Sequence, residues 1–324
     1  MSTVNTIRGP LDSGALGATL SHEHVAPGAA GMERVPGLYD EPWALAANLE
    51  ALKRATAVGI DSMVDLTPLD LGRQISLFQR IAEANPGVNI VPATGVYRWV
   101  PMYWSGADAD AVAEFFLREI QDGIEGTSIR AGVIKLAWDL EYRLDEGGPA
   151  SPRGQLEKTA RAAARASRAG GVPISCHTRA VDGLGTPLLD IFEDEGLDLR
   201  AVTIGHTNDS EDIDYVTGLA KRGATVGLDR FNPARGAEEL ARRSALALQM
   251  VEAGFAEQTS LGHDGFPVSY LGRKASPNHD CWLPVSTIEV PWLLGHGVSQ
   301  TDVDAMLKTS VRKTFEAAAA QAKA

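Results

Sequence analysis

Cysteine is scarce in this sequence of 324 residues, which contains only two, Cys176 and Cys281. Two cysteines cannot build the multiple disulfide bridges of small secreted proteins, so we expect a reducing, cytoplasmic location. No basic segment followed by an apolar run opens the sequence, and no signal peptide is expected. No stretch approaches the ~18 consecutive apolar residues of a membrane-spanning helix, so none is expected either.

Positive charge is also in short supply. Lysine and arginine together number 30 against 42 aspartates and glutamates, which gives a formal net charge of −12. This charge repels nucleic-acid phosphates and anionic lipids, so we expect neither nucleic acid nor a membrane as a partner. Hydrophobic residues make up 44% of the sequence, enough to bury a large core, which argues against global disorder.

The motif G-x-G-x-x-G is missing after the first predicted strand, which counts against the alternative architecture, a doubly wound open sheet. Short β-rich runs instead alternate with amphipathic helical stretches. Strands are predicted over residues 18–24, 62–67, 89–97, 131–137, 173–177, 201–206, 224–229 and 259–264. Helices are predicted over residues 41–58, 73–84, 108–124, 157–169, 187–195, 211–222 and 237–253. This alternation predicts an α/β fold, a (β/α)8 TIM barrel, as one domain over residues 1–324.

Two further segments follow the eighth predicted strand. Residues 265–283 are rich in glycine, proline and serine and form the longest predicted loop. Loops of this length are often functional. Residues 299–320 predict a helix that closes the fold, with an alanine-rich end.

Histidine gathers at the predicted strand ends, where the active sites of such barrels lie. Five of the seven histidines fall at or beside four of these ends: His22, His24, His177, His206 and His263. His22 and His24 are two apart on a strand, so they share a face and could bind one divalent cation. Such a pair is also typical of a polar strand end that faces solvent. The further strand-end residues, Asp264 among them, favour a metal: zinc, manganese, cobalt or iron.

Lys135 stands in an otherwise apolar predicted strand, over residues 132–137. Burial removes water from a lysine ammonium and lowers its pKa, and the neutral amine can react with carbon dioxide. The resulting carbamate is an anion whose two oxygens can bridge two metal ions. The alternative is a lysine that reaches solvent or pairs with a carboxylate. The nearby strand-end histidines favour the carbamate.

Five strings occur at these strand ends: residues 17–24, Ile134-Lys135, His177, residues 205–209 and His263-Asp264. In this order they resemble the phosphotriesterase family of the amidohydrolase superfamily, along nearly the whole chain. The resemblance implies two divalent metal ions, zinc before cobalt, manganese or iron, bridged by N6-carboxylated Lys135 and a hydroxide. It implies that His22, His24 and Asp264 hold the more buried ion, and that His177 and His206 hold the more exposed one. Asp264 would also accept a proton during attack.

The resemblance extends to residues around the metals. Asp209 and Asp229 match acidic positions on the family's proton route. Tyr97 and Arg230 resemble the phosphotriesterase-like lactonases, whereas dedicated organophosphate hydrolases tend to carry tryptophan and histidine there. Tyr97 would place its hydroxyl near the metals to orient a lactone. The alternatives are a half-buried ring at a strand end for Tyr97 and pairing with a carboxylate for Arg230.

Aromatic residues are expected in loops over the site: Trp99, Tyr103, Trp104, Trp138, Phe266, Tyr270 and Trp282. They predict an apolar mouth, which suits a small hydrophobic lactone, ester or organophosphate. The alternative for these rings is loop packing or the interface of a homodimer, and a homodimer is expected. Residues 231–233 and 265–267 depart from the lactonases, and these loops set the substrate pocket.

The expected function is a binuclear metal-dependent lactonase with promiscuous organophosphate hydrolysis. The alternatives within enzymes are a dedicated phosphotriesterase (aryldialkylphosphatase) or a carboxylesterase. A non-catalytic, metal-containing ligand-binding barrel is a further alternative. All six ligand positions are filled by residues able to bind metal, and this favours an enzyme.

Overall fold

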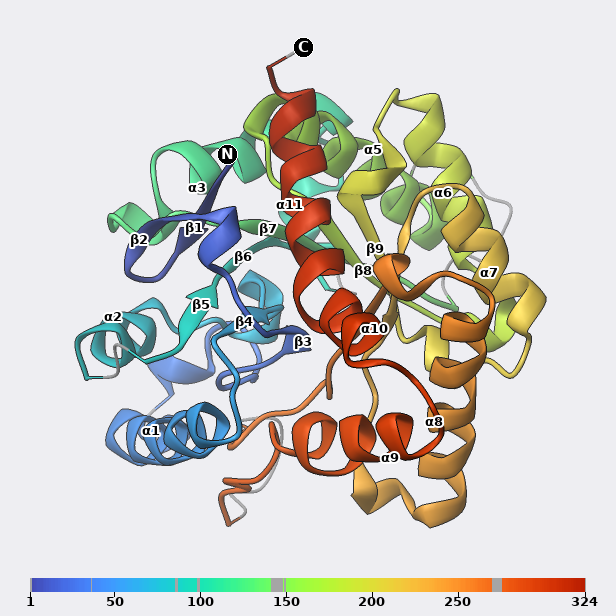
Figure 1. Ribbon diagram of the computed structural model, residues 1–324. Coiled ribbons are helices and arrows are strands. Elements are labelled where there is room, and N and C mark those ends of the chain that lie inside the picture. The colour runs from blue at the N-terminus through green and yellow to red at the C-terminus, as the bar shows by residue number, and fades with distance from the viewer. Residues whose placement is uncertain are drawn as a thin grey trace.

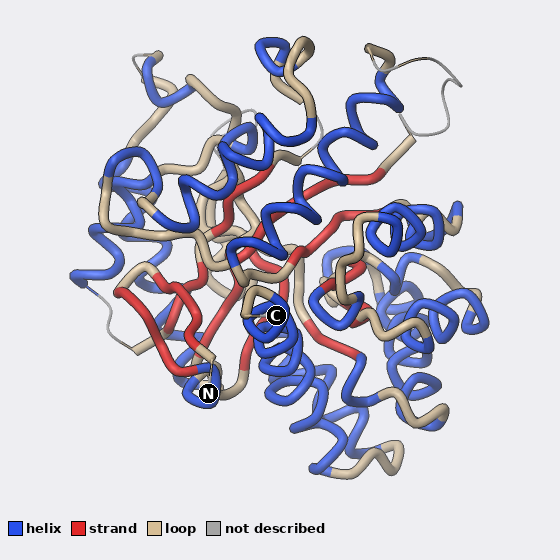
Figure 2. Tube along the Cα trace, turned by 90° about the horizontal axis from the view of Figure 1, so that it is seen from above, coloured by secondary structure: helices blue, strands red, loops and turns tan. Residues whose placement is uncertain are grey.

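A computed structural model describes residues 2–35, 37–84, 87–97, 100–140, 148, 150–269 and 276–323. Parallel strands lie at the centre and helices surround them (Figure 1, Figure 2). The central strands are β3 (Thr19–Glu23), β4 (Ser62–Asp65), β5 (Asn89–Val91), β6 (Ala93–Gly95), β7 (Val133–Trp138), β8 (Ile174–Thr178), β9 (Val202–Gly205), β10 (Thr225–Leu228) and β11 (Thr259–Leu261). They lie where the sequence predicted eight strands, the third being divided into β5 and β6 at Pro92.

The strands follow one another around a barrel. β3, β4 and β5 pair in that order, and β6 to β11 pair in chain order. The two sets meet at Pro92, which separates β5 from β6. At the other seam, Glu23 and Gly265 form a parallel bridge, and the His24 amide donates to the Gly265 carbonyl at 2.9 Å. The predicted (β/α)8 barrel is confirmed.

A buried hydrogen-bonded pair, Glu23 and His263, fastens the seam between β3 and β11. The Glu23 carboxylate accepts from the His263 amide at 2.9 Å and contacts His263 Nδ1 at 2.6 Å. His263 Nε2 in turn accepts from the Val285 amide at 2.9 Å, so Nδ1 carries the ring proton. Glu23 and His263 therefore serve barrel closure, and His263 does not face the predicted metal ligands.

The helices cover the outside of the barrel. They are α1 (Glu41–Ala57), α2 (Ile75–Ala84), α3 (Ala109–Gln121), α5 (Pro152–Gly170), α6 (Gly185–Asp194), α7 (Ile213–Lys221), α8 (Ala237–Glu252), α9 (Val290–Gly295), α10 (Gln300–Asp304) and α11 (Ser310–Gln321). Side-chain caps set several starts: Asp40, Asp108 and Asp212 each accept from an amide three residues on. Within the described ranges, every helix is too short or too polar to cross a bilayer.

The amino-terminal end of the barrel is plugged. An antiparallel hairpin, β1 (Thr3–Thr6) and β2 (Gly9–Asp12), lies there and was not predicted from the sequence. Val4 from the hairpin and Val311 and Phe315 from α11 join one apolar cluster with strand residues such as Val64 and Val133. This end is sealed, so the opposite end, where the strands finish, is left for a site.

Candidate metal centre

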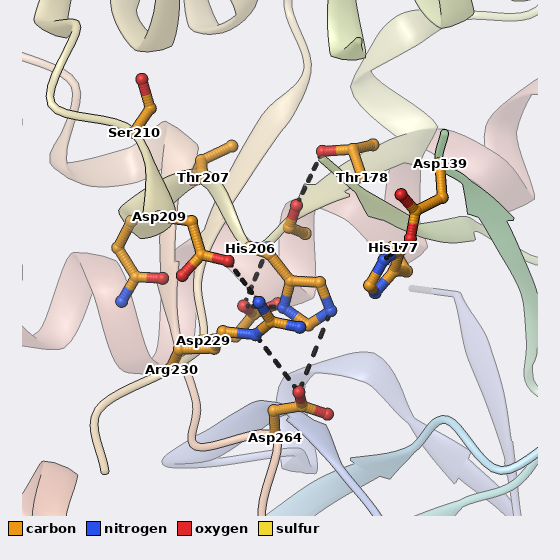
Figure 3. A network of polar contacts seen from close by, with 12 residues as sticks. Asp139, His177, Thr178, His206, Thr207, Asp209, Ser210, Asp229, Arg230 and Asp264 are labelled. Carbon is orange, nitrogen blue, oxygen red and sulfur yellow. Dashed lines mark hydrogen bonds and ion pairs between the residues drawn. The ribbon is translucent and has the colours of Figure 1, made fainter. Parts of the chain in front are cut away.

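The six predicted metal ligands come together at the carboxyl ends of the strands. They are His22 in β3, Lys135 in β7, His177 in β8, and His24, His206 and Asp264 in the segments that follow β3, β9 and β11. All are buried except Asp264, which is partly exposed. Figure 3 shows His177, His206 and Asp264 around a common space.

The distances within this group are short. Lys135 Nζ lies 3.0 Å from His22 Nε2. Asp264 Oδ1 lies 3.2 Å from His24 Nε2 and 3.6 Å from His22 Nε2. The rings of His177 and His206 meet edge to face with centroids 4.4 Å apart. Ligand atoms of His22, His24 and Asp264 all lie within 4.8 Å of one another, a spacing that suits one ion.

Two of the ligands hold a strained backbone. His206 and Asp264 have φ values of 62° and 53°, and among the described residues the only other non-glycine residue with positive φ is Glu125. A left-handed conformation costs a non-glycine residue on the order of 1 kcal/mol or more. Such strain persists where the surroundings require one side-chain direction, as they do at a preformed site.

Asp229 supports two of the histidines from outside. Its carboxylate contacts His22 Nδ1 at 2.6 Å and His206 Nδ1 at 2.8 Å. Burial acts to raise the pKa of Asp229, but the charges and hydrogen bonds of His206 and His22 hold it well below its usual value. His22, His206 and Asp229 are also close enough to hold an ion. The Asp229 carboxylate already pairs with the Nδ1 atoms of His22 and His206. We therefore interpret Asp229 as a residue that orients the two rings, so that both Nε2 atoms face the centre.

The other two histidines have outer partners of their own. His24 Nδ1 contacts Thr67 Oγ1 at 2.9 Å, and Thr67 Oγ1 donates to Asp65 at 3.3 Å. His177 Nε2 contacts Asp139 at 3.1 Å, which leaves its Nδ1 toward the centre. Each of the four histidines is thus oriented through one nitrogen and offers the other. Asp65, Thr67 and Asp139 were not among the residues singled out from the sequence.

The protonation states suit metal binding. Burial, followed by the charge of Lys135, lowers the pKa of His22 to about 4. Burial also lowers the pKa of His177, and places that of His206 well below its usual value. Neutral imidazole is the form that binds metal. The donor set therefore fits divalent metal ions of the zinc type.

Lys135 follows neither of the alternatives considered from the sequence. Its side chain is fully buried, so its ammonium does not reach solvent. The structure records no ion pair between Lys135 and a carboxylate of the described residues. Burial lowers the pKa of Lys135 to about 8, against the opposing charges of Asp264 and Asp229. The amine is therefore closer to its neutral, nucleophilic form than that of an exposed lysine.

The remaining predicted site residues lie around the centre. The Tyr97 hydroxyl is 3.4 Å from His177 Nδ1, and its ring is half-buried. Arg230 pairs with Asp209 and places its Nε 3.3 Å from Asp264 Oδ2 (Figure 3). The alternative expectation for Arg230, pairing with a carboxylate, is what the structure shows. Asp209 lies between Arg230 and Arg243, whose Nη2 is 2.6 Å away.

Three of the seven aromatic residues expected over the site lie elsewhere. Trp138 and Trp282 are buried in the core, and Trp104 packs against Phe115 and Phe116 with centroids 5.0 and 5.9 Å away. The expectation was wrong for these three because large rings gain most by burial. Tyr103 is exposed, and Phe266 does line a cavity at the centre. Trp99 and Tyr270 lie outside the described residues.

Two cavities adjoin the centre. One, of about 850 Å³, reaches Asp264, and we call it the apolar cavity. Its apolar wall consists of Phe266, Pro267, Val268, Leu283, Pro284 and Ile288. The other, of about 490 Å³, reaches His177 and Tyr97, and we call it the arginine cavity. Its arginines are Arg179, Arg230, Arg235, Arg242 and Arg243.

Comparison with known proteins shows which family has sequences like this one. The sequence model of the phosphotriesterase family matches residues 2–315. A phosphotriesterase homology protein of Mycobacterium tuberculosis is 35% identical over 98% of this chain and 98% of its own length. An aryldialkylphosphatase of Saccharolobus solfataricus is 30% identical over 94% of this chain and 96% of its own. An N-acetyltaurine hydrolase of Salmo salar is 24% identical over 94% and 95%.

Proposed function

We propose, from the premise that this chain belongs to the phosphotriesterase family of hydrolases, that it hydrolyses lactones by preference and phosphotriesters as a secondary activity. The observation that carries the preference is the Tyr97 hydroxyl, 3.4 Å from His177 Nδ1 at the edge of the centre. A phenol in this place can donate to one oxygen of a lactone. A phosphotriester presents its phosphoryl oxygen from a tetrahedral phosphorus, so we expect the same hydroxyl to align less well with it than with the planar carbonyl of a lactone.

The centre would hold two divalent ions, zinc in the first instance. His22, His24 and Asp264 would bind one ion, and His177 and His206 the other, with carboxylated Lys135 between them. When bound, the ions would act as Lewis acids on the substrate and lower the pKa of the attacking water. The fixed histidine orientations support this arrangement, because no ring needs to turn before it can bind.

Asp264 is the residue proposed to take the proton from the attacking water. Burial acts to raise its pKa, but the charge of His206 and its contacts with His24 and His22 hold that pKa well below the usual value. Arg230 Nε, 3.3 Å from Oδ2, restrains the carboxylate on the side away from His24. Arg230 and Asp209 then provide a polar route from Asp264 toward the arginine cavity.

The apolar cavity would receive the apolar part of the substrate. Asp264 lines it, so a group held there lies next to the proposed proton acceptor. Phe266 and Val268 supply carbon surface that would be removed from water on binding. This agrees with a hydrophobic lactone or ester and leaves the reacting carbonyl at the polar floor.

A panel of substrates tests the proposal. Protein reconstituted with zinc, cobalt or manganese is assayed with a γ-lactone, an aryl carboxylate ester and an aryl dialkyl phosphotriester. We expect kcat/KM to be highest for the lactone. A higher kcat/KM for the triester would make the chain a dedicated phosphotriesterase, the function that the name of the Saccharolobus relative favours. A higher value for the aryl ester would make it a carboxylesterase.

A further inference from the structure

The arginine cavity has an unusual charge for this protein. Five arginines line it together with three carboxylates, those of Asp139, Asp209 and Glu239, so the cavity is formally positive. The whole chain carries a net charge of −12. The charge of this cavity is therefore opposite in sign to the net charge of the protein.

Internal ion pairs hold most of the arginines in place. Glu239 contacts both Arg242 and Arg243, at 2.9 and 2.6 Å. Asp209 joins Arg243 to Arg230, as Figure 3 shows for the Arg230 contact. These pairs fix the direction of the guanidinium groups before any ligand arrives. Binding an anion there requires little reordering of side chains.

Some hydrogen-bond donors of the cavity are not used by these pairs. Arg243 is 2% exposed, yet its Nη1 has no hydrogen-bond partner among the described residues. A buried donor without a partner costs roughly 1–3 kcal/mol, so it calls for an acceptor. Arg235, at the end of the short helix Pro233–Arg235, is exposed, and its guanidinium has no partner in the described part of the chain.

We propose that the arginine cavity binds an oxyanion carried by the substrate, so that the preferred substrate is a lactone bearing a carboxylate or a phosphate group. This rests on the proposed function for the reaction itself. Guanidinium groups match both oxyanions through paired N–H donors. Tyr97 and His177 line the same cavity, so an anion bound there leaves the ring of the substrate beside the centre. The arginine cavity would recognise the anionic group, and the apolar cavity would bind the remaining part of the substrate.

Three lactones of one ring size test the proposal. One carries a methyl ester and is neutral, one carries the free carboxylate, and one carries a phosphate monoester. In wild-type holoenzyme we expect kcat/KM for at least one charged lactone to exceed that of the neutral lactone by roughly ten- to hundredfold, the effect of charge-assisted hydrogen bonds. The two charged compounds separate carboxylate from phosphate recognition. A neutral lactone that matches or exceeds both would overturn the proposal.

Arg235→Gln removes one charge and keeps most of the length of the side chain. Because Arg235 is exposed and has no partner among the described residues, the fold should tolerate the change. We expect the charged-to-neutral ratio of kcat/KM to fall about tenfold, and Arg179→Gln to lower the same ratio. Arg118→Gln, an exposed arginine of α3 outside the cavity, should leave the ratio unchanged. An unchanged ratio in both cavity variants would refute the role of this cavity.

Titration calorimetry with the same compounds keeps the test separate from turnover. If no lactone is hydrolysed, the proposed function fails, but the charged compounds should still bind about tenfold more tightly than the neutral one. That preference should shrink in Arg235→Gln and with rising salt, because screening weakens exposed charges. Equal binding of charged and neutral compounds, or equal binding by wild type and Arg235→Gln, would contradict the inference.

Discussion

The centre and the two cavities beside it are built from different parts of the chain. The centre takes its residues from strands and the positions that follow them, and each histidine is held by a partner such as Asp229 or Asp139. Apart from His177 and Thr178 of β8, the cavities take theirs from loops, short helices and α8. We infer that the centre determines the reaction and the cavities determine the substrate. Changes in the centre should therefore reduce turnover of every substrate, and changes in the walls should alter preference.

Lys135→Ala should have the largest effect. It removes the proposed bridge, so we expect loss of bound metal and loss of turnover with lactone, ester and triester alike. Short carboxylic acids added with metal should restore part of the activity by filling the space that the side chain leaves. Metal analysis and kcat on each substrate provide the measurement, with the exposed Lys308→Ala as control. Two bound ions and normal turnover in Lys135→Ala would rule out the carbamate.

Asp264→Asn should fold and bind metal but turn over slowly. The amide cannot accept a proton, and a general base contributes typically about 10²–10⁴-fold to rate. We expect kcat to fall by that factor for all substrates. Asp280→Asn, in the wall of the apolar cavity, is the matched control and should keep its kcat. A fully metallated Asp264→Asn variant with normal kcat would remove Asp264 from the mechanism.

Asp139→Asn tests whether the outer partners matter. An amide is a weaker acceptor for His177 Nε2–H, and such changes typically lower metal affinity about 10–100-fold. Competition with a chelator should show one ion lost more easily, while the other keeps its affinity. Asp304→Asn, at a partly exposed residue far from the centre in sequence, serves as control. Equal loss of both ions would show that Asp139 does not act through His177 alone.

The strand positions explain why so much of the centre was predictable. His22 and His24 share a face by strand alternation, and His177, His206 and Asp264 stand at the ends of other strands. A barrel brings all strand ends to one rim. The predicted helix bounds were also close to the observed ones, as for α1 (Glu41–Ala57) against the predicted 41–58.

Contacts across the chain explain why the surroundings were not predictable. Asp139 follows β7 directly, but nothing in the spacing indicates that it reaches His177, 38 positions on. Arg243 meets Asp209 across 34 positions, from a helix whose amphipathic pattern is satisfied by packing. The expectation that Trp138 and Trp282 line an apolar mouth was wrong, because their rings are buried in the core.

Tyr97→Phe should have the smallest effect and the most selective one. It keeps the ring and removes the hydroxyl near His177. A hydrogen bond to a neutral partner contributes about 0.5–1.5 kcal/mol, so lactone kcat/KM should fall roughly two- to tenfold. Triester kcat/KM should change less, and Tyr103→Phe, an exposed ring, should change neither. Equal losses of kcat/KM on lactone and triester would show that Tyr97 contributes to the reaction of both substrates and does not set the preference between them.

The metal content of active protein decides whether the reaction at this centre depends on bound metal ions. Protein purified without chelator is analysed for transition metals and assayed in parallel, then stripped with a chelator and reconstituted. We expect about two divalent ions per chain, loss of turnover on every substrate when they are removed, and recovery with zinc, cobalt or manganese. Full turnover by protein that holds no transition metal would contradict it.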